Sequence, residues 1–162
     1  MIQTSIATLA NCSQEQLDAL FREGSADRLP DGPVAGVALF APGTALSPVM
    51  ARLTQACSWQ GKVFDASRGT VRNKITPFGI TAVAGDVYRA PSWVDGKECV
   101  VLDYTKTSHL GRRVRDELRE IAPGRYLGRA YWRRIKVFDF ALQQGGMPGR
   151  VRLDAPSRAS PA

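Results

Sequence analysis

Hydrophobic and polar positions alternate along most of the chain after residue 60, and this period of two predicts a β-rich protein. Each apolar run is short, and turn residues such as glycine, proline and serine separate one run from the next. Short strands in such a series are typical of an antiparallel barrel or sandwich. We expect strands at these positions: 34–43, 61–66, 70–76, 80–90, 97–106, 125–134 and 135–143.

The first third of the chain contains two segments with a helical period. Residues 13–24 open with Ser13 and Gln16 at capping-box spacing, followed by an apolar stripe. Residues 46–59 have a serine that can cap, a proline at the first helical position and apolar residues at helical spacing. We therefore expect two short helices. Segment 111–121 fits a helical turn, a twisted strand or a strand-linking loop about equally well.

The length and composition bound the class of protein. A chain of 162 residues is long enough for one domain with a buried core, which we place at 1–144. Residues 145–162 are rich in glycine, proline, serine and arginine and lack apolar periodicity, so we expect a disordered tail. No run reaches the ~18 apolar residues of a membrane span, which argues against membrane insertion.

The amino-terminal residues lack a basic segment followed by a long apolar stretch, so we expect no secretory signal. The three cysteines, Cys12, Cys57 and Cys99, are widely spaced and odd in number. They suggest buried free thiols rather than a disulfide framework. Both observations favour a cytoplasmic protein.

The positive charge is concentrated in one segment. The net charge is +7, and residues 112–136 alone carry nine basic and three acidic side chains. A clustered basic face suits nucleic acid, an acidic lipid surface or an anionic ligand. Within 125–134, arginines alternate with aromatic residues on one strand face. This pattern fits either stacking on bases or an outer face with solvated arginines.

Motifs for common cofactors do not occur in the sequence. The cysteines and the single histidine, His109, show no metal-ligand spacing. No glycine-rich nucleotide-binding loop and no nucleophile elbow is found. We therefore expect no metal and no cofactor. His109 lies in a polar turn, where a solvated histidine is the ordinary interpretation and a proton shuttle is the alternative.

The stretch 98–121 carries the most informative charges, because Asp103 follows directly on an apolar run. A carboxylate on a buried strand must be paired, hydrogen-bonded or protonated. The nearby basic side chains are Lys106, Arg115 and Arg119, and we expect one of the two arginines to fold back over Asp103. Such a cluster is either a structural ion-pair network or a polar site that orients a ligand or moves a proton.

Two segments resemble those of the GXWXG-type proteins. In "GTALSPVMARLTQACSWQGKVFD" (43–65), a helix leads into an aromatic W-x-GK-x-F stretch. In "ECVVLDYTKTSHLGRRVRDELREIAPGRYLGRAYW" (98–132), an apolar strand ending at an aspartate precedes a second aspartate with a nearby arginine and a Leu-Gly strand. The matched positions are Trp59, Gly61, Lys62, Phe64, Asp103, Asp116, Arg119, Leu127 and Gly128. The resemblance implies a lipocalin-like (calycin-type) antiparallel barrel that encloses a small apolar ligand.

Three functions are consistent with these patterns. The first is a barrel that binds a small hydrophobic or amphipathic ligand, including one with an acid group. Its expected ligand-binding residues are Trp59, Lys62, Phe64, Asp103, Tyr104, Lys106, Arg119, Tyr126 and Trp132. The second is a cofactor-free isomerase, cyclase or hydratase. Its candidate catalytic residues are Asp103, Asp116 and His109. The third is a nucleic-acid-binding protein that uses the basic segment 112–136.

Overall fold

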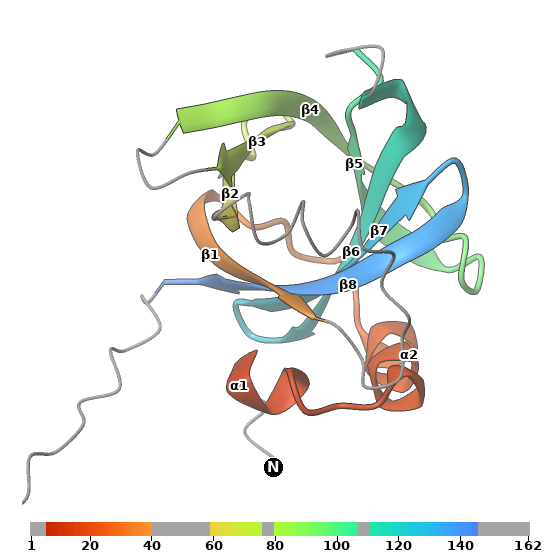
Figure 1. Cartoon of the computed structure of the whole chain (residues 1–162). Coiled ribbons are helices and arrows are strands. Elements are labelled where there is room, and N and C mark those ends of the chain that lie inside the picture. Colours follow the sequence, from red (N-terminus) through yellow and green to blue (C-terminus); the bar gives the residue numbers. More distant parts are fainter. Residues whose placement is uncertain (1–5, 40–58, 76–79, 107–110, 146–162) are drawn as a thin grey trace, which may run out of the picture.

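The computed structural model describes residues 6–39, 59–75, 80–106 and 111–145, and these residues form a mainly β protein. Eight antiparallel strands close into a barrel in which each strand pairs with the next and β1 pairs with β8 (Figure 1). The strands are β1 (Gly32–Leu39), β2 (Trp59–Asp65), β3 (Thr70–Ile75), β4 (Ile80–Pro91), β5 (Glu98–Asp103), β6 (Val114–Ala122), β7 (Arg125–Trp132) and β8 (Ile135–Gln144).

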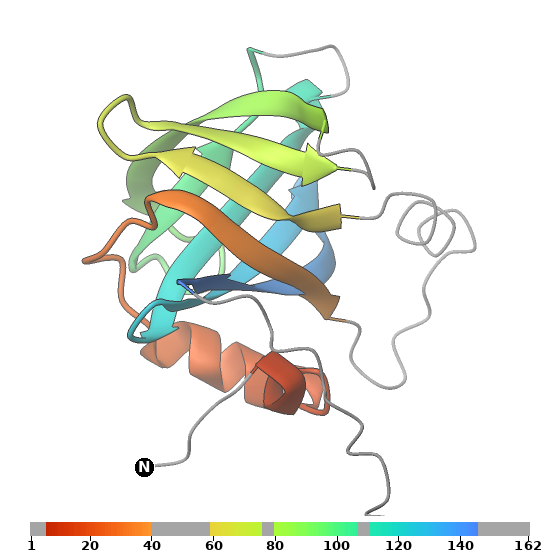
Figure 2. The same cartoon turned by 90° about the vertical axis from the view of Figure 1, so that its left-hand side faces the viewer.

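Two helices precede the barrel and lie on its outside, below β8 in Figure 1 and along the base in Figure 2. The first, α1 (Ile6–Leu9), is a single turn, and the second, α2 (Gln14–Glu23), is the main helix. The capping box between Ser13 and Gln16 begins α2, as the sequence predicts. Helix α2 contacts β6 and β7, so it covers one outer face of the sheet.

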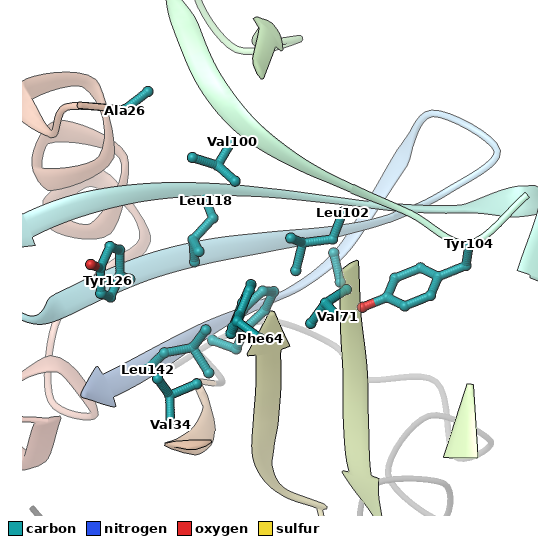
Figure 3. Packing of buried hydrophobic residues seen from close by; sticks show 12 residues of the cluster. Ala26, Val34, Phe64, Val71, Val100, Leu102, Tyr104, Leu118, Tyr126 and Leu142 are labelled. Carbon is teal, nitrogen blue, oxygen red and sulfur yellow. The ribbon is translucent and has the colours of Figure 1, made fainter. Parts of the chain in front are cut away.

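The closed sheet separates two apolar clusters. The inner cluster fills the barrel with buried side chains from every strand except β4, whose partly buried Val87 packs against them, and Figure 3 labels ten of the buried residues. Its buried members are Ala26, Val34, Phe64, Val71, Val100, Leu102, Tyr104, Leu118, Tyr126, Ala130, Phe140 and Leu142. The outer cluster lies between the helices and the sheet. Its buried members are Leu9, Leu17, Phe21, Leu39, Leu127 and Ala141.

Glycines inside the barrel give room to aromatic rings. A Cβ at Gly128 would lie 2.2 Å from the ring of Phe140, and a Cβ at Gly36 would lie 2.5 Å from the ring of Trp59. In the sequence, the small residues Gly128 and Ala130 in the middle of β7 suggest a strand that lies beside a cavity. That interpretation is wrong at Gly128, because the ring of Phe140 occupies the space.

Within the described residues the expected strands are confirmed, with ends shifted by a few residues, whereas positions 40–43 of the first expected strand lie outside them. The ambiguous segment 111–121 becomes a 3-10 turn (Gly111–Arg113) followed by β6, so the strand interpretation holds. The expected helix at 13–24 is confirmed as α2. The expected helix at 46–59 lies outside the described residues, except that Trp59 begins β2. The expected tail falls almost entirely on 146–162, which also lies outside them.

Neither α1 nor α2 is long and apolar enough to cross a membrane, within the part of the chain that the structure describes.

Candidate functional site

A lysine and an aspartate form an ion pair inside the barrel. The Nζ atom of Lys62 on β2 lies 2.9 Å from Oδ2 of Asp116 on β6, and the two side chains are only 4% and 7% exposed. The ammonium also donates to the hydroxyl of Tyr104 at 2.9 Å and to Oδ1 of Asn73 at 2.8 Å. The Tyr104 hydroxyl in turn donates to the same Asp116 oxygen at 3.2 Å. We call these four residues the interior polar cluster.

Strand alternation explains why these polar groups point inward. Lys62 has the same parity as Phe64 on β2, and Asp116 has the same parity as Leu118 on β6. Phe64 and Leu118 belong to the inner apolar cluster, so side chains two residues away share their face. Figure 3 shows Tyr104 among the inward-facing side chains of that cluster. The polar groups are therefore placed by the sheet itself.

Aromatic rings surround the ammonium. Its Nζ atom lies 5.6 Å from the ring centroid of Trp59, 5.4 Å from that of Tyr104 and 5.1 Å from that of Phe140. Rings at this distance stabilise a cation through their quadrupoles. Trp59 and Phe140 also pack edge to face, with centroids 5.7 Å apart. The cation therefore lies in an apolar surround, with Asp116 as its counter-ion.

The protonation states inside the barrel follow from this surround. Burial lowers the pKa of Lys62, but the charge of Asp116 and the hydroxyl of Tyr104 outweigh that effect, so its pKa is raised above the ordinary value. Burial raises the pKa of Tyr104 to about 12. At neutral pH the lysine is thus a fixed cation and the tyrosine a neutral hydroxyl.

A second polar network lies outside the barrel, beneath the segment that joins β4 to β5. Glu117 accepts hydrogen bonds from Ser92 Oγ at 2.5 Å, from the Trp93 backbone N–H at 2.8 Å and from Arg115. Arg119 pairs with both carboxylate oxygens of Asp95 at 2.8 Å. These groups are fully partnered by neighbouring protein atoms, which indicates a structural role.

The structure corrects the placement of Arg119 and Asp103. Arg119 faces α2, not the barrel interior, and its guanidinium lies over the ring of Phe21. The expected pair between Asp103 and Arg119 does not form, because odd positions of β5 and β6 point outward and Arg119 reaches Asp95. Arg115, the other expected partner, lies opposite Asp103 in the strand register, but its ion pair is with Glu117.

Asp103 sits on the outer surface, where the Tyr88 hydroxyl donates to it at 3.0 Å and the Thr105 backbone N–H at 2.9 Å. Partial burial raises its pKa, but these hydrogen bonds and the charge of Arg115 hold the pKa below the usual range. Lys106 is 81% exposed and pairs with Asp86. Neither Asp103 nor Lys106 lies with the interior polar cluster.

The remaining expected residues divide by position. Phe64 and Tyr126 are buried in the inner apolar cluster, and Trp132 is half-buried at the end of β7. His109 lies outside the described residues. The structure thus brings together four residues that the sequence analysis names: Trp59, Lys62, Tyr104 and Asp116.

Sequence reasoning missed two members of this site, Asn73 and Phe140. Asn73 lies two residues after Val71 on β3, and this spacing indicates that its side chain shares the inward face with Val71. Phe140 lies two residues before Leu142 on β8 and therefore also shares its inward face. Neither residue stands out in the sequence, because their role depends on which strands are neighbours.

The described part of the chain contains no group of three or more His, Cys, Asp or Glu side chains able to hold a metal ion.

No protein-family model and no curated protein matches the chain. A solved structure of a protein from Thermomonospora curvata has a similar fold. The similarity covers 84% of this chain and 90% of that one, with a TM-score of 0.60 and 15% sequence identity. At this identity the likeness shows the shared fold alone.

Proposed function

We propose that this protein binds a small amphipathic molecule inside its barrel, with the polar end of the ligand at the interior polar cluster. The Lys62–Asp116 ion pair, held inside the barrel by Tyr104 and Asn73, is the observation that carries this proposal. A buried ion pair is a poor way to stabilise a core, since apolar residues of similar size often do as well or better. Its presence in an apolar interior favours a role in recognition.

The architecture supports the same function. An eight-stranded antiparallel barrel of this kind is the architecture of lipocalin-like proteins, whose interior is just wide enough for one small ligand. The sequence resemblance to GXWXG-type proteins implies the same calycin-type barrel. Small-molecule sites are also mostly apolar, with a few convergent polar groups, which matches the rings around Lys62.

The interior polar cluster lies near the end of the barrel where β2 begins and β5 ends, since Trp59 begins β2 and Tyr104 directly follows β5, and we expect a ligand to enter from this end. The rings of Trp59 and Phe140 lie directly beside the ammonium of Lys62. Trp59 is only half-buried, so we expect rotation of its side chain to make room for a ligand without moving a strand.

Binding is favoured over proton-transfer catalysis by the protonation states. A general acid or base works best with a pKa near the working pH. The pKa of Lys62 is raised and that of Tyr104 is about 12, so neither group exchanges a proton readily near neutrality. A permanently charged ammonium beside a neutral hydroxyl instead suits recognition of an acid group.

The test compares two substitutions with opposite expected effects on an anionic probe, anilinonaphthalene sulfonate. Lys62→Met removes the cation and should weaken probe binding. Asp116→Asn removes the competing carboxylate and should strengthen it. Lys106→Met, in an exposed ion pair, is the matched control and should change nothing. Circular dichroism and the urea midpoint identify any variant that loses its fold, and Lys62→Arg keeps the charge if methionine is not tolerated.

Native mass spectrometry of the freshly purified chain gives a second measurement. We expect a small molecule to co-purify with the parent and to be lost from Lys62→Met. The proposal fails if no molecule co-purifies and the two interior variants bind the probe as the parent does.

A further inference from the structure

A shallow groove of about 320 Å³ lies on the outer surface, where the β7–β8 hairpin meets the 3-10 turn before β6. Five arginines line it: Arg112, Arg113, Arg115, Arg133 and Arg134. Among the described residues that line it, Asp103 is the single carboxylate. The groove thus concentrates positive charge drawn from two segments of the chain, 112–115 and 133–134.

Most of this charge is not neutralised by the protein. Among the described residues, Arg112, Arg113, Arg133 and Arg134 take part in no ion pair. Arg115 is the exception, since it pairs with Glu117. Four guanidinium groups that repel one another and lack acidic partners are expected where an anion binds.

The backbone of the hairpin also favours a functional role for two of these arginines. Arg133 and Arg134 form the two-residue turn, with φ of 48° and 71°. Such a turn prefers Asn-Gly, because a positive φ is unfavourable for residues with long side chains. The Arg133 backbone N–H donates to the Arg113 carbonyl at 2.9 Å, which fixes the turn against the neighbouring arginines. Strain of this kind is characteristic of binding sites.

Two exposed aromatic side chains share the groove. Tyr88 is 42% exposed and Trp93 is 38% exposed. The guanidinium carbons of Arg115 and Arg134 lie 4.4 Å and 4.8 Å from the ring centroid of Trp93. Planar arginines beside exposed rings form a surface on which flat groups stack, while the arginines contact phosphate in pairs.

We propose that this groove binds single-stranded nucleic acid, with phosphates on the four unpaired arginines and bases against Tyr88 and Trp93. The rings favour unpaired bases over a duplex, whose bases are already stacked. The open shape of the groove suits a passing chain better than an enclosed mononucleotide. This site is separate from the interior polar cluster and does not depend on it.

Fluorescence anisotropy with a labelled oligothymidylate of about 12 nucleotides measures the binding. Four phosphate contacts predict that log Kobs falls with log salt at a slope near −3, at about −0.7 per contact on a single strand. The key variant is Arg133→Asn with Arg134→Gly, which restores the preferred turn sequence. It should weaken binding about tenfold or more and reduce the slope to about half.

The same variant should raise the melting temperature by roughly 2–4 °C, because the strained turn is relieved. A gain in stability together with a loss of binding separates a functional role from a structural one. Arg68→Asn with Arg72→Gln removes two exposed arginines elsewhere and is the charge-matched control. Tyr88→Ala should weaken binding, whereas Tyr88→Phe, which keeps the ring, should not.

Several outcomes would overturn the proposal. They are unchanged binding in the hairpin variant, an equal loss in the charge-matched control, and tighter binding of duplex than of single strands. Thymidine monophosphate that binds as tightly as the oligonucleotide, or anionic phosphatidylserine vesicles that bind when the oligonucleotide does not, would also overturn it.

Discussion

Replacement of Arg119 by methionine should lower the free energy of unfolding by about 3–5 kcal/mol. The side chain of Arg119 is 0% exposed, while that of Asp95 is 13% exposed. Besides its two bonds to Asp95, the guanidinium donates to the backbone carbonyls of Phe21, Lys97 and Glu98 at 3.0–3.1 Å. Methionine fills part of the volume but offers no donor, so a carboxylate and three carbonyls each lose at least one hydrogen bond.

The same pair predicts part of the acid sensitivity of the protein. Hydrogen bonds from Arg119 lower the pKa of Asp95 from its ordinary 3.8 to about 2. Because the pKa is depressed in the folded state, this stabilisation is fully present above about pH 4 and is lost as the pH falls towards 2. It amounts to roughly 2 kcal/mol. The Arg119→Met variant should lack this part of the pH dependence.

Urea denaturation followed by tryptophan fluorescence measures both effects, at neutral pH and at intervals between pH 4 and 2. Arg68→Met is the matched control, because the side chain of Arg68 is 79% exposed and its pair with Asp65 spans 3.6 Å. The control should change the unfolding free energy by less than about 1 kcal/mol. The reasoning is refuted if Arg119→Met is within about 1 kcal/mol of the parent and keeps the parent's acid dependence.

Three further predictions rest on other parts of the barrel. Gly128→Ala should cost about 1–3 kcal/mol in urea denaturation, because its Cβ would lie 2.2 Å from the ring of Phe140, and an unchanged midpoint would contradict this packing. Asp103→Asn should cost about 1 kcal/mol or less, since Asp103 is partly exposed, so a large loss would show that it belongs to a buried network. Burial raises the pKa of Cys99 to about 12. Iodoacetamide at pH 8 should therefore leave Cys99 unmodified in the folded protein and alkylate it in urea, as peptide mass mapping can measure.

The sequence by itself determined the local structure of the described residues. Alternation of apolar and polar residues located the strands, because successive side chains of a strand point to opposite faces. The capping box at Ser13 located the beginning of α2, because the Ser13 and Gln16 side chains satisfy backbone N–H groups within three residues. Interactions between residues so close in the sequence can be predicted from the local sequence alone.

Alternation also shows that Val100, Leu102 and Tyr104 share a face, but both faces of β5 are apolar enough to be interior. Only the closed barrel decided that Tyr104 points inward and Asp103 outward. The helix α2 and the segment 92–97 cover the outer face of neighbouring strands, so a second buried environment exists outside the barrel. That environment accepts Arg119, which the sequence analysis had assigned to the ligand site.

The interior polar cluster also could not be predicted from the sequence alone, because its members are far apart in the chain. Lys62 and Asp116 are 54 residues apart, and Lys62 meets Asn73 and Tyr104 only because their strands lie around one lumen. The order and register of the strands are set by the sum of many backbone hydrogen bonds and inward-facing apolar contacts, which no single motif encodes. The sequence therefore determined which residues are able to form a buried charged site, whereas closure of the sheet decided which of them meet.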